Sequence, residues 1–294
     1  MRFITCRLPD GVEDPAILSE DGRQVWPLSW LGLSYETLSE AIPFLTPQVR
    51  YGLSLAIAGI PALPVEAVTL ESPIPAPAQD VICLGINYMA HSEEAEKYSA
   101  AAFATKHEDA IYFSKRVTRA VPDGGPIEAH TDLVKKLDYE CELAVVLGRD
   151  ARDVPAGQTR DYIFGYTILN DVSARDVQTA HKQWYFGKSL DGFTPIGPCI
   201  VTADAFADYP PRLGIRSFVN GEKRQDSNTA LQIFDIDHVI AELSQGMTLK
   251  AGTIIATGTP AGVGMGMDPP QFLKPGDVVR CEIDGIGTLT NPVK

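Results

Sequence analysis

Two glutamates two positions apart, Glu140 and Glu142, stand in the apolar segment Leu137 to Val146. If this segment is a strand, its alternation places both carboxylates on one face, about 6.6 Å apart along the backbone. Two like charges beside a run that enters the core are costly unless a cation neutralises them. The pair therefore indicates a divalent-metal site; the alternative is a solvated strand face with two ordinary glutamates.

A third carboxylate follows the next apolar run. A strand is predicted over 162–169, and Asp171 stands at its end, ahead of a polar turn. Three carboxylates without a His or Cys ligand form a hard oxygen site, which suits Mg²⁺ or Mn²⁺ rather than zinc. An octahedral ion in such a site would keep about three positions for water and a chelating substrate.

A histidine and a glutamate three residues apart offer a general base. On a helical turn His91 and Glu94 would share a face. A carboxylate bonded to one ring nitrogen orients the imidazole and raises its basicity, which suits the activation of water. The alternative is an ordinary surface helix end rich in glutamate.

Two glycine-containing segments could contact a ligand. Gly187-Lys188-Ser189 looks like a phosphate loop, but the first glycine of that motif falls at Lys182, so the phosphate loop is excluded. In an acidic protein Lys188 could instead bind a substrate carboxylate or an oxyanion. The glycines of segment 256–264 allow close backbone approach to a ligand; a plain surface loop is the alternative.

The composition excludes several classes of partner. The formal net charge of −13 leaves no basic surplus for nucleic acid or for anionic lipid. No stretch reaches the roughly 20 apolar residues of a membrane span, and the N-terminus lacks a secretory signal. The 5 cysteines are scattered, which is typical of reduced thiols. We expect a cytoplasmic enzyme.

A proline-rich segment divides the chain. Alternating prolines in 71–80 favour extended backbone and forbid a helix, so we place a boundary there. The expected parts are a small N-terminal α/β module at 1–72 and a main domain at 73–294. In the module the sequence predicts strands at 2–7 and 22–26 and helices at 35–42 and 47–59.

The main domain is predicted to be rich in strands. One amphipathic helix is expected over 229–245, and Asn220-Gly221 predicts a hairpin turn. Because no regular helical crossovers separate the strands, a mixed β-roll or β-sandwich (α+β) is favoured over a doubly wound sheet. The strands are expected at 81–85, 139–147, 162–169, 196–202, 216–219, 253–257 and 277–283.

Segment 93–109 is rich in Glu, Lys, Ser and Ala and has little apolar periodicity. Such a segment buries little apolar area, so burial does little to offset the conformational entropy that the segment loses on ordering. It should therefore open easily. We expect it to act as a lid over the metal site; a permanently ordered surface helix is the alternative.

Taken in chain order, these segments resemble the fumarylacetoacetate hydrolase superfamily over residues 81–293. Each motif is weak alone, but their order is specific to the family. The motifs are Asn-Tyr-x-x-His-x-x-Glu from Asn87, Leu-Asp-Tyr-Glu-x-Glu-Leu from Leu137, Asn-Asp-x-Ser-Ala-Arg-Asp-x-Gln from Asn170, Lys-Ser-Leu-Asp-Gly-Phe-x-Pro-x-Gly-Pro from Lys188 and Thr-Gly-Thr-Pro-x-Gly-Val-Gly from Thr257.

The resemblance implies a mixed β-roll catalytic domain, a homodimer and one Mg²⁺ or Mn²⁺ per subunit. It assigns the metal to Glu140, Glu142 and Asp171. It makes His91 and Glu94 a catalytic dyad. Positions that line the substrate pocket in such enzymes are matched by Arg175, Gln178, Lys188 and Thr259.

The same resemblance implies a hydrolase that cleaves a carbon–carbon bond in a small β-diketo acid, such as an acylpyruvate or fumarylpyruvate. His91 would activate water, and Lys188 would help to stabilise the oxyanion. Decarboxylation of an oxaloacetate-type β-keto acid, or isomerisation of a dienoate, is the close alternative at the same metal. A carboxylate-binding protein without catalysis is a third.

Overall fold

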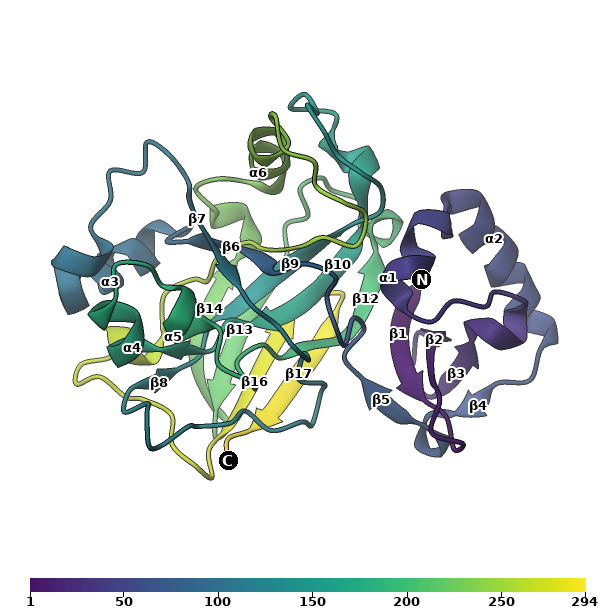
Figure 1. The fold of residues 1–294 in the computed structure, drawn as a ribbon, viewed down its shortest axis with the longest axis horizontal. Helices are drawn as coiled ribbons and strands as arrows, with labels where there is room; N and C mark the ends of the chain where they lie inside the picture. The colour runs from purple at the N-terminus through teal and green to yellow at the C-terminus, as the bar shows by residue number, and fades with distance from the viewer.

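The computed structural model describes all residues from 1 to 294. A mixed sheet of 11 strands runs through the whole molecule (Figure 1). In spatial order it contains β4 (Leu63–Pro64), β3 (Gln24–Pro27), β2 (Glu13–Leu18), β1 (Arg2–Arg7), β12 (Ile196–Thr202), β10 (Ile163–Asn170), β9 (Cys141–Leu147), β15 (Ile254–Ala256), β6 (Val81–Gly85) and β7 (Ile111–Lys115), with β5 (Thr69–Glu71) paired to β1.

A second sheet of 4 strands packs against β9, β10 and β12 and makes the main domain a sandwich. It contains β14 (Glu222–Asn228), β13 (Gly214–Val219), β16 (Val278–Ile283) and β17 (Gly287–Pro292). The mixed-β fold class expected from the sequence is therefore confirmed. No helix is both long enough and apolar enough to cross a membrane.

The central strand β9 is buried on both faces. Cys141, Leu143 and Val145 belong to the core between the two sheets. Ala144 and Val146, on the opposite face, belong to a second core that β1, β10 and the N-terminal helices share. Every second residue of β9 therefore faces the same core, and Glu142 lies on the face of Ala144.

The N-terminal module continues the large sheet. Strand β1 pairs with β12 through Arg2↔Val201 and Phe3↔Ile200. Of the module's helices, α2 (Pro47–Ala56) lies at its outer side in Figure 1, and α1 (Leu38–Ala41) lies on the side that faces the main domain. The division at residue 72 remains an interpretation, because backbone hydrogen bonds join the strands on either side of it.

The helices of the main domain gather at the end of the sheet away from this module (Figure 1). They are α3 (Met89–Phe103), α4 (Arg175–Ala180) and α5 (Tyr185–Lys188), with α6 (Ile236–Leu243) lying apart from them. The short pair β8 (Leu137–Asp138) and β11 (Ser173–Ala174) lies beside α4 and α5.

Three predicted elements differ from the structure. The helix expected over 35–42 begins only at Leu38, after its cap Thr37. The helix expected over 229–245 is wrong at its start, because Asp235 caps α6 by accepting a hydrogen bond from His238 N (2.8 Å) and only a single 3₁₀ turn, Thr229–Leu231, precedes it. The strand expected over 139–147 begins only at Cys141. The residues before it leave the large sheet, and β8 pairs with β11 instead.

Gly165 lets β10 approach β12 closely, since a Cβ at this position would lie 2.3 Å from Val201 O. We predict that Gly165→Ala lowers the free energy of unfolding by about 1–3 kcal/mol, because backbone must move to admit the methyl group. The control is Gly52→Ala in α2, where nothing lies within 4 Å. That change should raise stability by about 0.5–1 kcal/mol. Urea unfolding checks both, and equal effects would contradict the packing argument.

Candidate active site

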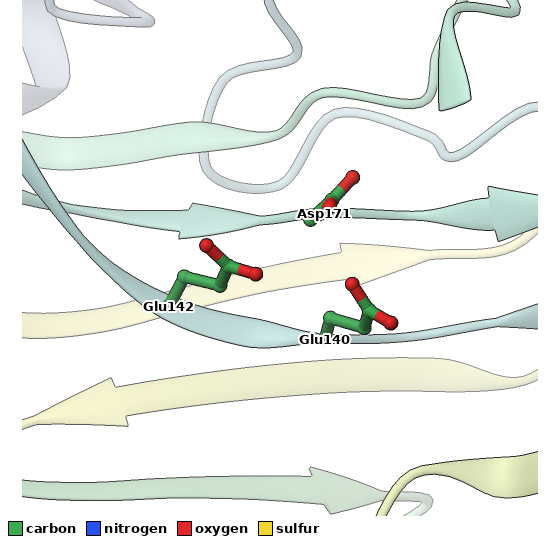
Figure 2. A group of neighbouring side chains, drawn as sticks. All are labelled: Glu140, Glu142 and Asp171. Atoms are coloured by element: carbon green, nitrogen blue, oxygen red, sulfur yellow. The ribbon is translucent and has the colours of Figure 1, made fainter. Parts of the chain in front are cut away.

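Three buried carboxylates converge between β9 and β10. Ligand oxygens of Glu140, Glu142 and Asp171 all lie within 4.8 Å of one another. Figure 2 shows Glu142 on β9 and Glu140 just before it, both with their carboxylates directed toward Asp171 on the neighbouring segment, which follows β10. The Asp171 backbone N–H donates to Glu140 O (2.8 Å), which fixes the two segments together. The expected convergence of the three acidic side chains is therefore present.

Three buried cations surround this carboxylate triad. Lys188 Nζ donates to Glu140 Oε2 and Asp171 Oδ2, both at 2.6 Å. Lys115 Nζ donates to the other oxygen of Asp171 at 2.5 Å. Arg175 Nη2 lies 2.6 Å from Glu140 Oε1. Two of the three acids are thus ion-paired on both oxygens.

The three cations pair with Glu140 and Asp171 but not with Glu142, and the pKa values of the two glutamates reflect this difference. Burial alone would raise the pKa of Glu140, but Arg175 and Lys188 outweigh it and hold the pKa well below its usual range. For Glu142, burial and the charges of Asp171 and Glu140 raise the pKa well above the ordinary value. Its one hydrogen bond comes from Gly258 N–H (2.8 Å). Glu142 is the acid that most requires a further cation.

The donor set fits Mg²⁺ or Mn²⁺, both of which prefer carboxylate oxygen. Including Asp138, which pairs with Arg175 Nε at 2.9 Å, four buried carboxylates face three buried cations. With all four acids ionised the cluster carries one excess negative charge, which a divalent ion would turn into one excess positive charge. Such a balance suits a small anionic substrate.

The expected base lies on the first turn of α3. His91 is 4% exposed, and its Nδ1 lies 3.6 Å from Glu94 Oε2 without any hydrogen-bond partner. The separation exceeds a hydrogen bond, because Gly262 N–H holds the Glu94 carboxylate at 2.9 and 3.0 Å from its two oxygens. Glu94 therefore acts on the ring as a nearby charge in this arrangement.

A small cavity of about 20 Å³ brings the candidate residues together. All the residues predicted for the site line it except Glu94 and Asp171, which lie just behind its wall. The polar lining consists of His91, Glu140, Glu142, Arg175, Gln178, Lys188 and Thr259. The rest of the wall is mainly apolar and contains Leu84, Ile86, Phe103, Phe113, Trp184 and Met265.

The polar side chains of the lining differ in how many hydrogen-bonding groups remain free for a ligand. Gln178 Oε1 accepts from Arg175 Nη1 (3.1 Å), and its amide nitrogen makes no hydrogen bond within the chain. The Thr259 hydroxyl donates to Cys141 O (2.9 Å) and accepts from Gln225 Nε2 (2.7 Å). Gln178 is therefore ready to bind a substrate oxygen, whereas the Thr259 side chain is engaged in holding its own loop.

Two buried charged residues of the site were not predicted. Lys115 lies at the end of β7, a strand without a clear sequence signal, and reaches Asp171 from the side opposite Lys188. Asp138 accepts hydrogen bonds from Gly264 N (2.7 Å) and Met265 N (3.0 Å) as well as from Arg175. Two signals could have found it: its position two residues before Glu140, and its place in the family motif that starts at Leu137.

The family model of the fumarylacetoacetate (FAA) hydrolase C-terminal domain matches residues 80–294. The chain belongs to the fumarylacetoacetate hydrolase family. A relative within the family is the oxaloacetate tautomerase YisK of Bacillus subtilis, which is 43% identical over 226 residues, or 77% of this chain and 73% of the relative. The family resemblance inferred from the five motifs is thus confirmed.

Solved structures of the family share the whole fold. A fumarylacetoacetate hydrolase from the psychrophile Exiguobacterium antarcticum is 38% identical, with a TM-score of 0.85 over 100% of this chain and 99% of that one. A maleylpyruvate hydrolase from Sphingobium sp. SYK-6, solved with manganese(II) and pyruvate, is 28% identical, with a TM-score of 0.78 over 100% and 98%. The family therefore includes tautomerases as well as hydrolases.

We predict that Glu142→Gln removes stabilisation by Mg²⁺ or Mn²⁺ without unfolding the protein. A bound ion should stabilise the wild type by about 2.7 kcal/mol at 100 times its Kd. Because the folded pKa of Glu142 is raised, its ionisation lowers stability as pH rises, so metal-free Glu142→Gln should be at least as stable as wild type above neutral pH.

Thermal unfolding with and without Mn²⁺ measures both effects, with the exposed Glu96→Gln as the control. An unchanged Mn²⁺ response in Glu142→Gln would contradict the assignment of the triad to a metal.

The segment expected to be a lid forms α3 through Phe103, with a non-helical residue at Ser99. Three residues of α3 itself, His91, Ala95 and Phe103, are buried. We predict that residues 91–109 open readily without ligand and become protected when oxalate and Mg²⁺ bind. Hydrogen exchange checks this, and unchanged protection at saturation would favour the permanently ordered helix.

Proposed function

We propose that this chain is a Mg²⁺- or Mn²⁺-dependent enzyme that transfers a proton at the carbon next to the keto group of a small 2-keto acid, of the oxaloacetate class. The observation that carries the proposal is the cavity, which contains one buried imidazole and lies beside a carboxylate triad that the protein's own cations do not fully neutralise. The 43% identity with an oxaloacetate tautomerase supports the same class of reaction.

Glu140, Glu142 and Asp171 would hold the ion. When bound, the ion would act as a Lewis acid that stabilises negative charge on the substrate's oxygens. Lys188 keeps one of its three N–H donors beyond Glu140 and Asp171, and Gln178 keeps its amide N–H groups. These donors would orient the substrate carboxylate beside the triad.

His91 would move the proton. Since Nδ1 faces Glu94, Nε2 is the nitrogen left to face the substrate. It would take a proton from the carbon beside the keto group, and the imidazolium would return a proton to the keto oxygen. One C–H bond is thereby exchanged for one O–H bond. The nearby Glu94 carboxylate stabilises the transient positive charge of the ring.

Hydrolysis of a carbon–carbon bond in an acylpyruvate is the second candidate function. The same imidazole could take a proton from water instead of from carbon. The likeness to the maleylpyruvate hydrolase, which was solved with manganese(II) and pyruvate, favours it. Assays of oxaloacetate tautomerisation and of pyruvate release from acylpyruvates, with and without Mg²⁺, decide between the two reactions.

Two further expectations accompany the proposal. The homodimer implied by the family resemblance is a proposal that sedimentation of the purified protein would check. The cytoplasmic location is likewise a proposal, which fractionation of the source cells would check.

We predict that His91→Ala lowers the rate of tautomerisation, and of any acylpyruvate hydrolysis, by about 10²–10⁴-fold, the usual scale of a general base. Decarboxylation of oxaloacetate should suffer less, because it needs no proton acceptor. The matched control is His238→Ala, an exposed histidine on α6. Stopped-flow absorbance of the enol and release of pyruvate are the readouts. Equal losses in all reactions would contradict the role given to His91.

A further inference from the structure

One wall of the cavity is aromatic and is built around Trp184. The residue stands immediately before α5, four positions ahead of Lys188, so that both side chains face the cavity from one turn. Its ring packs against Phe113 (centroids 5.4 Å apart) and Phe103 (5.7 Å). Phe103 ends α3, the helix that carries His91 on its first turn.

A glycine sets the position of this ring. A Cβ at Gly85, the last residue of β6, would lie 2.3 Å from Trp184 Cζ3 and 2.9 Å from Cη2. The indole therefore lies directly on the backbone of the large sheet. Gly85 and Phe113, both on the large sheet, hold the indole as a boundary of the cavity, and Phe103 of α3 covers it in this arrangement.

The distance from this boundary to the carboxylate triad is short. Lys188 Nζ, which contacts Glu140 and Asp171, lies 5.0 Å from the ring centroid of Phe113, and Phe113 contacts Trp184. One aromatic ring thus separates Trp184 from the polar end of the cavity. The cavity volume of about 20 Å³ is far below that of ligand sites, which span about 300–1,000 Å³, so the aromatic wall leaves little room beyond the polar end in this arrangement.

We propose that Trp184 determines the chain length of the substrate: its indole closes the cavity opposite the triad and restricts the enzyme to short 2-keto acids. The inference rests on the proposed function, because that function fixes the orientation of the substrate, with its keto-carboxylate end at the triad. The rest of the substrate must then extend toward the apolar wall, where the indole occupies the space that additional methylene groups would need.

The test measures binding, so that it is independent of turnover. Affinities of linear 2-oxo acids from pyruvate to 2-oxooctanoate are determined by calorimetry with Mg²⁺ present. In the wild type, affinity should fall as the chain lengthens. In Trp184→Ala it should rise by about fourfold per added methylene until the new space is filled, the factor that corresponds to about 0.8 kcal/mol per buried CH₂.

Trp184→Phe retains an aromatic ring of smaller size and should give an intermediate series if the alanine variant is unstable. Tyr185→Ala changes an exposed neighbour that does not line the cavity and should leave the wild-type series unchanged. The same chain-length dependence in wild type and in folded Trp184 variants would overturn the inference. Absence of turnover on every substrate, with the binding series as expected, would overturn the proposed function alone.

Discussion

The repulsion among three carboxylates held within 4.8 Å of one another is the constraint on which the rest of the site depends. In a buried setting this arrangement is costly unless each charge is matched. Lys188 bridges two of the acids, and Lys115 and Arg175 each hold one more oxygen. Glu142 is left with one backbone N–H and a raised pKa, so the protein's own cations leave this acid unmatched at the point where a divalent ion would bind.

The backbone makes this convergence by interrupting a strand. Segment 137–147 leaves the large sheet at Tyr139 and Glu140, so that Asp138 pairs with β11 while Glu142 remains in register with Leu169 of β10. At the break, the Glu140 N–H donates to the side-chain oxygen of Asn170 (3.0 Å) instead of to a backbone carbonyl of a neighbouring strand. The same interruption points Asp138 toward Arg175 and toward the loop that contacts α3. The candidate metal ligands, the candidate substrate donors and the proposed base are thus connected through one irregular segment.

The sequence allowed prediction of those site residues whose positions follow from the local periodicity of the chain. The alternation of Glu140 and Glu142, and the place of Asp171 after its strand, follow from a period of two residues, and the family motifs added Arg175 and Gln178. Lys115 and Trp184 were missed because their roles arise only when β7 and the turn before α5 are brought against β6 and β10. The helix expected over 229–245 failed for a local reason, since the Asp235 cap was not weighed against a longer apolar pattern.

The central claim is that Glu140, Glu142 and Asp171 bind one divalent ion that the surrounding lysines and arginine do not replace. Anomalous diffraction from crystals grown with Mn²⁺ and oxalate tests it most directly. The account predicts a single manganese peak in each chain, coordinated by oxygens of all three side chains, with oxalate completing the coordination. A manganese-free triad, with Lys188 still bridging Glu140 and Asp171 at saturating Mn²⁺, would contradict it.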